Sequence, residues 1–349
     1  ANDTWGDTGA WVTDGGGGTA WDSIVYDTVN DQVLIGVGNG SPWNADIRDP
    51  DSDGDNLFLS SILAVDADTG AYRWHYQTTP RDRWDYTATQ QITLADLPLG
   101  EDGANRRVVM QAPKNGFFYV LDAADGELIS ATPFTAQNWT TGQFDENGRP
   151  ELVEEAVDLA LYAVVPGPTG AHNWHPMAFN PDTGLVYIPV NEIPFFYDKT
   201  RNVEDSKSFW NIGYDVAAGW PVEYPAGTLD VIRDLDGGSL LAWDPVKAEP
   251  RWAVPFPLPL NGGVLSTQAG LVFQGNKFGE FVAYDAETGE RLWADKLVGN
   301  AAAAPMTYEI DGEQYLSVLS GWGSVSSLIA GFTYGEAKSK EPARVITFK

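Results

Sequence analysis

The segment Leu63-Ala64-Val65-Asp66-Ala67-Asp68-Thr69-Gly70-Ala71-Tyr72-Arg73-Trp74 contains the clearest pattern in the sequence. It reads as a strand, an Asp-x-x-x-Gly turn and a second strand that ends on tryptophan. In such a turn the aspartate accepts hydrogen bonds from backbone amides, and the glycine takes the left-handed conformation. The pattern returns over residues 282–293, and weaker copies begin at Tyr119, Ala178 and Leu241. The segment is therefore one unit of an internal repeat.

The turn positions of the repeat indicate its length. They are Asp66, Asp122, Asn180, Asp244 and Asp285, with Asp27 as a candidate for an earlier one. A unit of about 40–50 residues, enlarged by loop insertions, is typical of propeller blades rather than of helical solenoids. The repeated tryptophans Trp74, Trp252 and Trp293 are expected to wedge between neighbouring blades as large apolar knobs. We therefore predict an all-β chain that forms a β-propeller or a large arc of one.

The composition narrows the classes of function. The chain has 349 residues, and 49 acidic against 21 basic residues give a formal net charge of −28. Such a surface repels nucleic acid and anionic membranes, and it attracts basic proteins or divalent cations. No apolar run approaches the ~20 residues that span a bilayer. The absence of cysteine excludes disulfides, thiolate metal sites and c-type haem attachment within this chain.

Several stretches fall outside the repeat. Residues 130–170 and 193–236 are expected to be long loops, with one short helix within residues 151–161. The aspartate-rich run over residues 46–55 is expected to be a solvated loop, with a second Ca²⁺ site as the alternative. Residues 15–18 are four glycines, either a flexible linker or a place of close backbone approach. The opening at Ala1, without a start Met or signal pattern, suits a mature or truncated chain.

The polar residue with the most unusual surroundings is Asp85. It stands between two large aromatics, Trp84 and Tyr86, in the loop from Thr78 to Thr89. Partial desolvation raises the pKa of such an aspartate and suits a general base or a metal ligand. An aspartate that caps a turn is the simpler interpretation of a single loop position.

Other polar residues also follow strand ends, namely Asn39, Lys114, Asn173 and the Gly321-Trp322-Gly323 turn. Radially arranged blades bring such residues onto one axial site. A carboxylate and an amide oxygen suit a hard cation such as Ca²⁺. A lysine suits an anionic or quinonoid oxygen, and two tryptophans suit a planar ring. The residues alone thus indicate an axial site for a flat anionic ligand and Ca²⁺.

Six stretches, taken in order along the chain, carry a resemblance to a known family. They are Gly15–Ser23, Gly36–Asn44, Trp84–Thr87, Gln111–Tyr119, His172–Pro176 and Gly321–Gly323. In these stretches the sequence resembles the quinoprotein alcohol dehydrogenases, which use pyrroloquinoline quinone (PQQ) and a metal ion. The similarity runs over essentially the whole chain, and six motifs in sequence make it specific.

The resemblance implies a role for the residues around the cofactor. Trp21 is expected to stack on one face of the PQQ ring, and Asn39 is expected to be a ligand of the metal. Asn173, Trp322 and Gly321 are expected to supply further cofactor contacts.

The resemblance also implies the chemistry. Asp85 is expected to bind the metal and to act as the general base that takes the alcohol proton while hydride passes to PQQ. Lys114 is expected to bond the ortho-quinone oxygens. Members that use lanthanides carry an extra aspartate two residues after the catalytic one. Thr87 stands at that position, so Ca²⁺ is expected here. Leu260 replaces a tryptophan that often precedes the Asn-Gly-Gly turn, which leaves substrate preference open.

The resemblance covers the C-terminal part of an eight-bladed catalytic propeller, about five to six blades by the repeat spacing. We expect residues 1–349 to form a single propeller domain that lacks the N-terminal blades. Those blades supply a glutamate metal ligand, further cofactor contacts and a disulfide in the family. An open arc exposes blade faces, so a second chain that completes the propeller is a candidate partner.

Two classes of function follow. The first is an enzyme that oxidises a small alcohol to an aldehyde with PQQ and Ca²⁺ and passes electrons to a cytochrome c-type acceptor, in the bacterial periplasm or outside the cell. The second is a non-catalytic propeller that acts as a binding or assembly scaffold. An inactive fragment of a dehydrogenase stands between them. A scaffold needs neither Asp85 nor Asn39 nor Lys114, so their presence together favours the enzyme.

Overall fold

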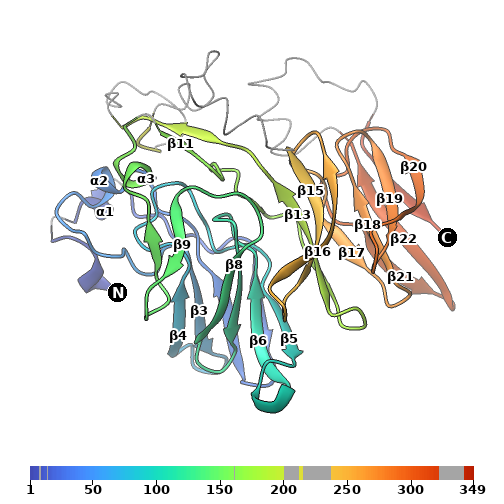
Figure 1. The fold of residues 1–349 in the computed structure, drawn as a ribbon, viewed down its shortest axis with the longest axis horizontal. Coiled ribbons are helices and arrows are strands. Elements are labelled where there is room, and N and C mark those ends of the chain that lie inside the picture. The colour runs from blue at the N-terminus through green and yellow to red at the C-terminus, as the bar shows by residue number, and fades with distance from the viewer. Residues whose placement is uncertain (8, 14, 161, 200–211, 215–236, 322–341) are drawn as a thin grey trace. The chain divides into compact units, whose positions relative to one another are not determined.

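The chain folds mainly into antiparallel β-sheets (Figure 1). The computed structural model describes residues 1–349 except 8, 14, 161, 200–211, 215–236 and 322–341. Two four-stranded sheets come first along the chain, and the strands of each follow one another in sequence order. Their strands are β1 (Ile24–Asp27), β2 (Gln32–Gly36), β3 (Ser61–Asp66) and β4 (Tyr72–Gln77), then β5 (Thr93–Leu97), β6 (Arg106–Gln111), β7 (Phe117–Asp122) and β8 (Leu128–Pro133).

Three further sheets follow later in the chain, two with four strands and one with three. Their orders are β12-β13-β15-β16, β17-β18-β19-β20 and β21-β22-β23. The strands are β12 (Ala178–Asn180), β13 (Leu185–Asn191), β15 (Gly238–Asp244), β16 (Glu249–Phe256), β17 (Val264–Ser266), β18 (Leu271–Gly275), β19 (Glu280–Asp285), β20 (Arg291–Lys296), β21 (Met306–Ile310), β22 (Glu313–Ser320) and β23 (Arg344–Phe348). The all-β prediction is confirmed.

Short elements occupy the segments that lack the repeat. They are β9 (Thr140–Phe144), β10 (Pro150–Leu152), α3 (Glu154–Asp158), β11 (Tyr162–Val164) and β14 (Phe195–Tyr197). Strand β9 pairs with β10, and β11 pairs with β14. The expectation of loops alone is therefore wrong here, because these segments bury Trp139 and Tyr197 and must pair the backbone groups that they bury with them. The short helix is confirmed as α3. Residues 200–211 and 215–236 lie outside the described residues.

Four more short helices lie elsewhere in the described part: η1 (Asn2–Thr4), α1 (Ala10–Thr13), α2 (Ala45–Arg48) and η2 (Glu101–Gly103). No helix in the described ranges is long and apolar enough to span a bilayer. The chain forms two compact units, residues 1–174 with 192–235 and residues 175–191 with 236–349. One propeller domain over residues 1–349 stays a prediction.

The turn chemistry of the repeat is confirmed in the outer hairpin of each four-stranded sheet. Asp66 Oδ1 accepts the Thr69 amide at 2.9 Å, and Asp285 Oδ1 accepts the Thr288 amide at 2.9 Å. Asp122 and Asp244 accept backbone amides in the same way. A β-bulge recurs between the third and fourth strands of all four sheets. The repeat therefore specifies a bend in the outer hairpin as well as a turn.

Two of the predicted turn positions lie in the first hairpin of their sheets and not in the outer hairpin. Asn180 lies between β12 and β13, and Asp27 lies between β1 and β2. Both accept a backbone amide two residues on, which explains their similarity to the outer turns. Assigning Asn180 to the same place in the repeat as Asp66 was wrong, because first and outer hairpins share the same turn chemistry.

The repeated tryptophans dock on the turn glycines of the next sheet in two cases. The ring of Trp74 lies so close to Gly126 that a Cβ atom there would overlap it, and Trp252 covers Gly289 in the same manner. The indole N–H of Trp252 also donates to the Ala286 carbonyl at 3.1 Å. Trp293 differs, because it is 41% exposed and packs edge-on against Phe348. The predicted knob between blades is thus confirmed for Trp74 and Trp252, whereas Trp293 contacts the next sheet through Phe348 and stays partly exposed.

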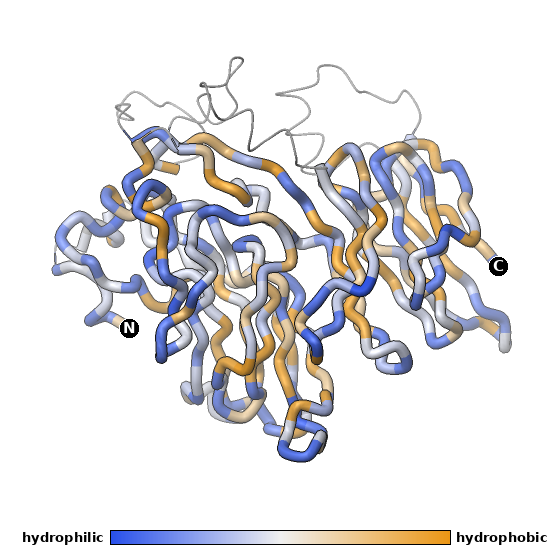
Figure 2. Tube along the Cα trace, viewed as in Figure 1, coloured by the Kyte–Doolittle hydropathy of each residue, from blue (hydrophilic) through white to orange (hydrophobic). Residues whose placement is uncertain are grey.

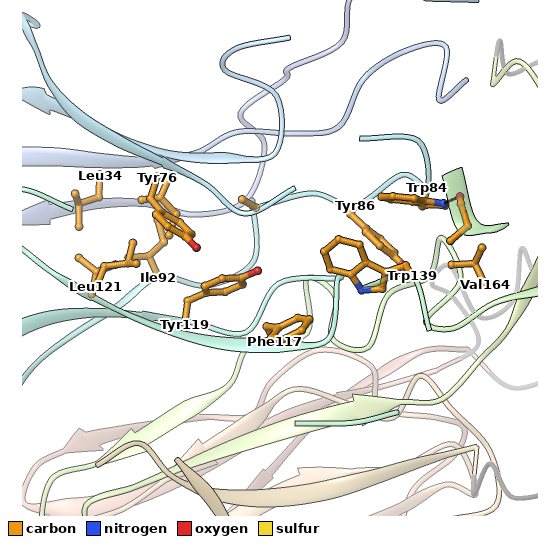
Figure 3. Close-up of a cluster of buried hydrophobic side chains, with 14 of the residues drawn as sticks. Leu34, Tyr76, Trp84, Tyr86, Ile92, Phe117, Tyr119, Leu121, Trp139 and Val164 are labelled. Carbon is orange, nitrogen blue, oxygen red and sulfur yellow. Dashed lines mark hydrogen bonds between the residues drawn. The ribbon is translucent and has the colours of Figure 1, made fainter. Parts of the chain in front are cut away.

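The largest core cluster belongs to the first unit. Figure 3 shows its aromatic row, in which Trp84, Tyr86 and Trp139 lie together beyond Phe117 and Tyr119. Ring centroids within the first three are 5.4–5.6 Å apart. Hydrophobic stretches follow the strands, while many of the connecting turns are hydrophilic (Figure 2). Burying rings of this size is the dominant favourable contribution to folding.

The sheet topology places the predicted site residues within the described part of the chain at one kind of strand end. In an antiparallel meander, the loop between the second and third strands and the connection that leaves the fourth lie at the same end. Asn39, Lys114 and Gly321 lie in, or at the start of, loops between the second and third strands of their sheets. Asp85 and Asn173 lie in connections between sheets.

Replacing Gly126 by Ala is expected to lower the free energy of unfolding by about 2–5 kcal/mol. About 1–2 kcal/mol comes from the left-handed conformation, in which Gly126 has φ +77°, and about 1–3 kcal/mol comes from displacing the Trp74 ring. Gly70→Ala is the matched control, since Gly70 has φ +70° in the same turn but open space around it. Urea unfolding of both variants measures the difference, and equal losses would contradict the docking.

Candidate functional site

Asp85 lies in a tight turn on top of the aromatic cluster. Its φ of 66° is in the left-handed region, which costs energy for any residue with a side chain. The flanking Trp84 and Tyr86 are fully buried, and their rings contact Trp139. Figure 3 shows the rings of Trp84, Tyr86 and Trp139 lying together in the core. The turn therefore holds the aspartate at the surface of a rigid apolar layer.

Lys114 is the partner of Asp85. Its Nζ donates to Asp85 Oδ2 at 2.8 Å and to the Asp85 carbonyl at 3.0 Å, and the two side chains are only 7% and 16% exposed. Burial raises the pKa of the Asp85 carboxyl, and the charge and hydrogen bond of Lys114 oppose that rise. Trp139 donates its indole N–H to the carbonyl of Asn115 at 2.8 Å, which ties the lysine turn to the same aromatic cluster.

The loop of Asn173 packs against Lys114. A Cβ atom at Gly170 would overlap the Lys114 side chain, so this glycine makes room for the lysine. The Ala171 amide donates to the Lys114 carbonyl at 2.9 Å. Asn173 is buried, with its amide group bonded to the Thr169 carbonyl at 2.8 Å and to the Trp174 amide at 2.8 Å. Asn173 thus shapes this loop, in addition to any contact with a ligand.

Asn39 lies on a loop that is bonded to the aspartate turn. Ser60 connects the two, because its amide donates to the Gly38 carbonyl at 2.9 Å and its hydroxyl donates to the Tyr86 carbonyl. The Asn39 amide group donates to the Gly40 carbonyl at 2.9 Å. Among the described residues, none donates to the side-chain oxygen of Asn39, so this acceptor is open to a ligand.

The four glycines of residues 15–18 do not form an open linker, because part of this run packs against the backbone of a neighbouring loop. Gly17 pairs with Gly40 in an isolated bridge, and a Cβ atom at Gly17 would overlap the Asn39 carbonyl. The following Trp21 is 47% exposed, so much of its indole is accessible. The sequence prediction of close backbone approach is confirmed, and the surface that is approached is the loop of Asn39.

The last two predicted residues belong to the second unit. Gly321 pairs with Asn300, and its amide donates to the Asn300 carbonyl at 3.0 Å. Trp322 lies outside the described residues, so its cofactor contact stays a prediction. Leu260 is buried and has φ 61°, a strained conformation for leucine, which Asn191 supports by accepting its amide at 2.6 Å.

Sequence reasoning missed two buried charged residues beneath the site, Arg48 and Asp82. Neither is exposed, and Asp82 Oδ1 accepts the amides of Trp84 and Tyr86 at 3.1 and 3.0 Å. Burial raises the pKa of Asp82 to about 6. Burial also lowers the pKa of Arg48 to about 10. The spacing of Asp82 to Trp84 and Tyr86 was the available signal, since an aspartate that precedes a turn bonds amides two and four residues on.

The aspartate-rich run is not a solvated loop throughout. Asp49 is buried and faces Arg81, and Asp55 forms a forked ion pair with Arg149 at the surface. The expectation was wrong because arginines distant in sequence return to these carboxylates. The alternative of a second Ca²⁺ site gains no support, since the described residues contain no cluster of three metal-ligating Asp, Glu or His side chains.

The residues present fit part of a site for PQQ and a divalent cation. The open amide oxygen of Asn39 and the carboxylate of Asp85 are hard oxygen donors, and Trp21 and Lys114 offer a ring face and an ammonium group. Ca²⁺ takes six to eight oxygen ligands. Two side chains do not complete that number, so a Ca²⁺ ion held by Asn39 and Asp85 would need further oxygen ligands from other groups.

Removing the lysine is expected to raise the pKa of Asp85 further. Lys114→Gln deletes the cation that opposes the effect of burial, so a higher pH is needed to ionise the carboxyl. A ¹³C NMR titration of the aspartate carboxyls in the metal-free chain measures this pKa. Lys199→Gln is the control, since Lys199 pairs with Asp158. An unchanged or lowered Asp85 pKa in Lys114→Gln would contradict the ion pair.

Comparison with known proteins identifies the family of the chain. A PQQ family model described as "Glucose/ethanol/alcohol dehydrogenase, beta-propeller domain" matches residues 1–136 and 237–316. The quinohemoprotein alcohol dehydrogenase ADH-IIG of Pseudomonas putida is 48% identical, over 97% of this chain and 48% of that protein. The chain spans about half the length of the curated relatives it matches.

Solved structures of alcohol dehydrogenases are also similar to this chain. The quinohemoprotein alcohol dehydrogenase of Comamonas testosteroni matches with a TM-score of 0.87 at 43% identity, over 99% of this chain and 50% of that chain. A europium-containing methanol dehydrogenase matches with a TM-score of 0.78 at 30% identity, over 97% of this chain and 56% of that chain. The β-propeller fold and the family resemblance drawn from the six motifs are thereby confirmed. The chain belongs to the PQQ-type glucose/ethanol/alcohol dehydrogenase β-propeller family.

Proposed function

We propose that this chain carries the catalytic site of a PQQ- and Ca²⁺-dependent alcohol dehydrogenase that oxidises alcohols to aldehydes. The observation that carries the proposal is the ion pair of Lys114 and Asp85, shielded from water on a turn bonded to the loop of Asn39. A largely buried pair of opposite charges costs desolvation energy, and a scaffold has no use for it.

The chain offers separate groups to the cofactor and the metal. Trp21 would stack on the cofactor ring, and Lys114 would donate to its quinone oxygens. Asn39 and Asp85 would ligate Ca²⁺ through one oxygen each. When bound, PQQ supplies a two-electron acceptor for hydride from the alcohol carbon, and Ca²⁺ supplies Lewis-acid polarisation.

Asp85 would take the hydroxyl proton of the alcohol. Burial raises the pKa of this carboxyl, which makes it a stronger base once it is ionised. Lys114 favours the ionised form in the cofactor-free chain, and a divalent cation favours it further. The rings of Trp84 and Tyr86 exclude water from the side of the turn that faces the core.

Ca²⁺ is the expected metal because of Thr87. Its side chain is buried, and its hydroxyl accepts the Gln90 amide group at 2.7 Å. The position therefore offers a neutral, already bonded hydroxyl, not the additional carboxylate expected of lanthanide-dependent members. A lower charge count suits a divalent rather than a trivalent ion.

The partners of the enzyme would be a small alcohol, a cytochrome c-type electron acceptor and a second polypeptide that completes the propeller, outside the cytoplasm. Support for the second polypeptide comes from an apolar sheet face. Ile24 on β1 is 61% exposed, and Tyr72 on β4 is exposed as well. Beside them lies a hollow of about 470 Å³ lined by Trp5, Trp11 and Leu63, among other mainly apolar residues. Exposed apolar surface of this kind marks an interface.

Titration of the purified chain with PQQ and Ca²⁺, followed by alcohol-dependent reduction of a dye, tests the function. Turnover is expected in the wild-type chain and loss of at least about 100-fold in Asp85→Asn, since general base catalysis contributes about 10²–10⁴-fold. Asp96→Asn on β5 is a control at an exposed aspartate.

The other outcomes separate the alternatives. PQQ binding without turnover, restored by adding an N-terminal half from a relative, would identify an incomplete enzyme. No PQQ binding in either case would leave the scaffold as the function.

Thr87→Asp is expected to raise the affinity for Eu³⁺ relative to Ca²⁺ by about tenfold, because it adds one carboxylate near the metal. Thr87→Asn introduces a side chain with the shape of aspartate but without its charge. This variant is expected to leave the ratio of the Eu³⁺ and Ca²⁺ affinities unchanged. Isothermal titration of the PQQ-loaded chain with each ion measures both ratios. A wild-type chain that prefers Eu³⁺ would overturn the assignment of Ca²⁺.

A further inference from the structure

Arg48 lies in α2 and connects two loops of the site from below. Its Nη1 donates to the carbonyls of Pro42 at 2.6 Å and Trp43 at 3.1 Å, on the loop that begins with Asn39. Its Nη2 donates to the carbonyl of Asp82 at 2.8 Å, at the start of the aspartate turn. One guanidinium group thus bonds both loops at once.

The contact between Arg48 and the Asn39 loop is also a packing contact. A Cβ atom at Gly40 would overlap the guanidinium group, so the glycine next to Asn39 lies flat on the arginine. Asn56 accepts from the remaining side of Arg48, with its Oδ1 at 3.1 Å from Nη2. Arg48 has no exposed surface, and a planar group with five donors is suited to bonding several fixed oxygens in this way.

Asp82 extends the connection to Asp85. Its Oδ1 accepts the amides of Trp84 and Tyr86, the residues directly before and after Asp85. Two bonds to one oxygen hold the backbone amides of the residues before and after Asp85, which keeps the strained φ of 66° in place. The other carboxyl oxygen of Asp82 is buried and has no hydrogen-bond partner in the described part of the chain.

We infer that Arg48 and Asp82 are positioning residues that hold Asn39 and Asp85 at a fixed separation. This inference rests on the proposed function, in which Asn39 and Asp85 share one metal ion. Neither residue touches the substrate. Arg48 fixes one loop against the other, and Asp82 fixes the backbone that carries the base.

Asp82→Ala and Asp82→Asn separate positioning from a general effect on folding. Ala removes the acceptor of both amides, whereas Asn keeps an oxygen at the same place. In the PQQ- and Ca²⁺-loaded chain, kcat is expected to fall about 100-fold in Asp82→Ala, since misplacement by ~1 Å costs about that factor, with little change in KM. Asp82→Asn is expected to retain kcat within a few fold. Equal loss in both variants would overturn the inference.

Crystal structures of the same variants, without cofactor, give a readout that does not depend on activity. In Asp82→Ala, residue 85 is expected to leave the left-handed region and its distance to Lys114 Nζ to lengthen. An unchanged turn would overturn the inference even if activity falls. A wild-type chain without Asp85-dependent turnover would refute the proposed function while the structural comparison still decides the positioning role.

Arg48→Lys provides a second test if Asp82→Ala does not fold. A lysine reaches fewer of the bonded oxygens, so the Asn39 loop is expected to move relative to the aspartate turn. The affinity for Ca²⁺ is expected to fall by about tenfold, as for other outer-shell changes, while Lys114 stays paired with Asp85. A crystal structure in which both loops keep their places, with wild-type Ca²⁺ affinity, would exclude Arg48 from this role.

Discussion

Consecutive strands of an antiparallel meander run in opposite directions, so every second turn lies at the same end. The outer turns that begin with Asp66, Asp122, Asp244 and Asp285 occupy one end of the four-stranded sheets, and tryptophans dock on the glycines of two of them. Asn39, Asp85 and Lys114 occupy the other end, in segments that do not repeat. The topology therefore separates the residues that join one sheet to the next from those that can do chemistry, and the latter can vary without loss of the repeat.

In the first unit, buried charged residues bond the loops that carry Asn39, Asp85 and Lys114. Lys114 offsets the burial of Asp85, and the guanidinium of Arg48 is bonded to oxygens in two loops. A chain with a net charge of −28 has few cations, and several of them are used to bind its own loops together. Breaking such a pair leaves an uncompensated buried charge, so these contacts hold the loops in place.

The sequence allowed prediction of the features that are local or repeated. Turn aspartates such as Asp66 bond the amides next to them, and the motifs assigned Asp85 and Lys114 to one site, although not to an ion pair with each other. Arg48 and the buried Asp49 were not predicted, because their partners are distant in sequence and an aspartate-rich run reads as a solvated loop. Asn180 was misplaced in the repeat since its turn uses the same chemistry in another hairpin. The placement of these residues depends on contacts between segments distant in sequence, and a local sequence pattern does not reveal such contacts.

Trp74 precedes Gly126, the glycine on which it docks, in the sequence. A protein is synthesised from its N-terminus, so the indole is made before the hairpin that covers it. Trp252 stands in the same relation to Gly289. Until that hairpin has been translated, the outer strand of the preceding sheet presents a bare aromatic surface. Each such stage of synthesis therefore leaves one large apolar side chain uncovered until the next hairpin has been translated.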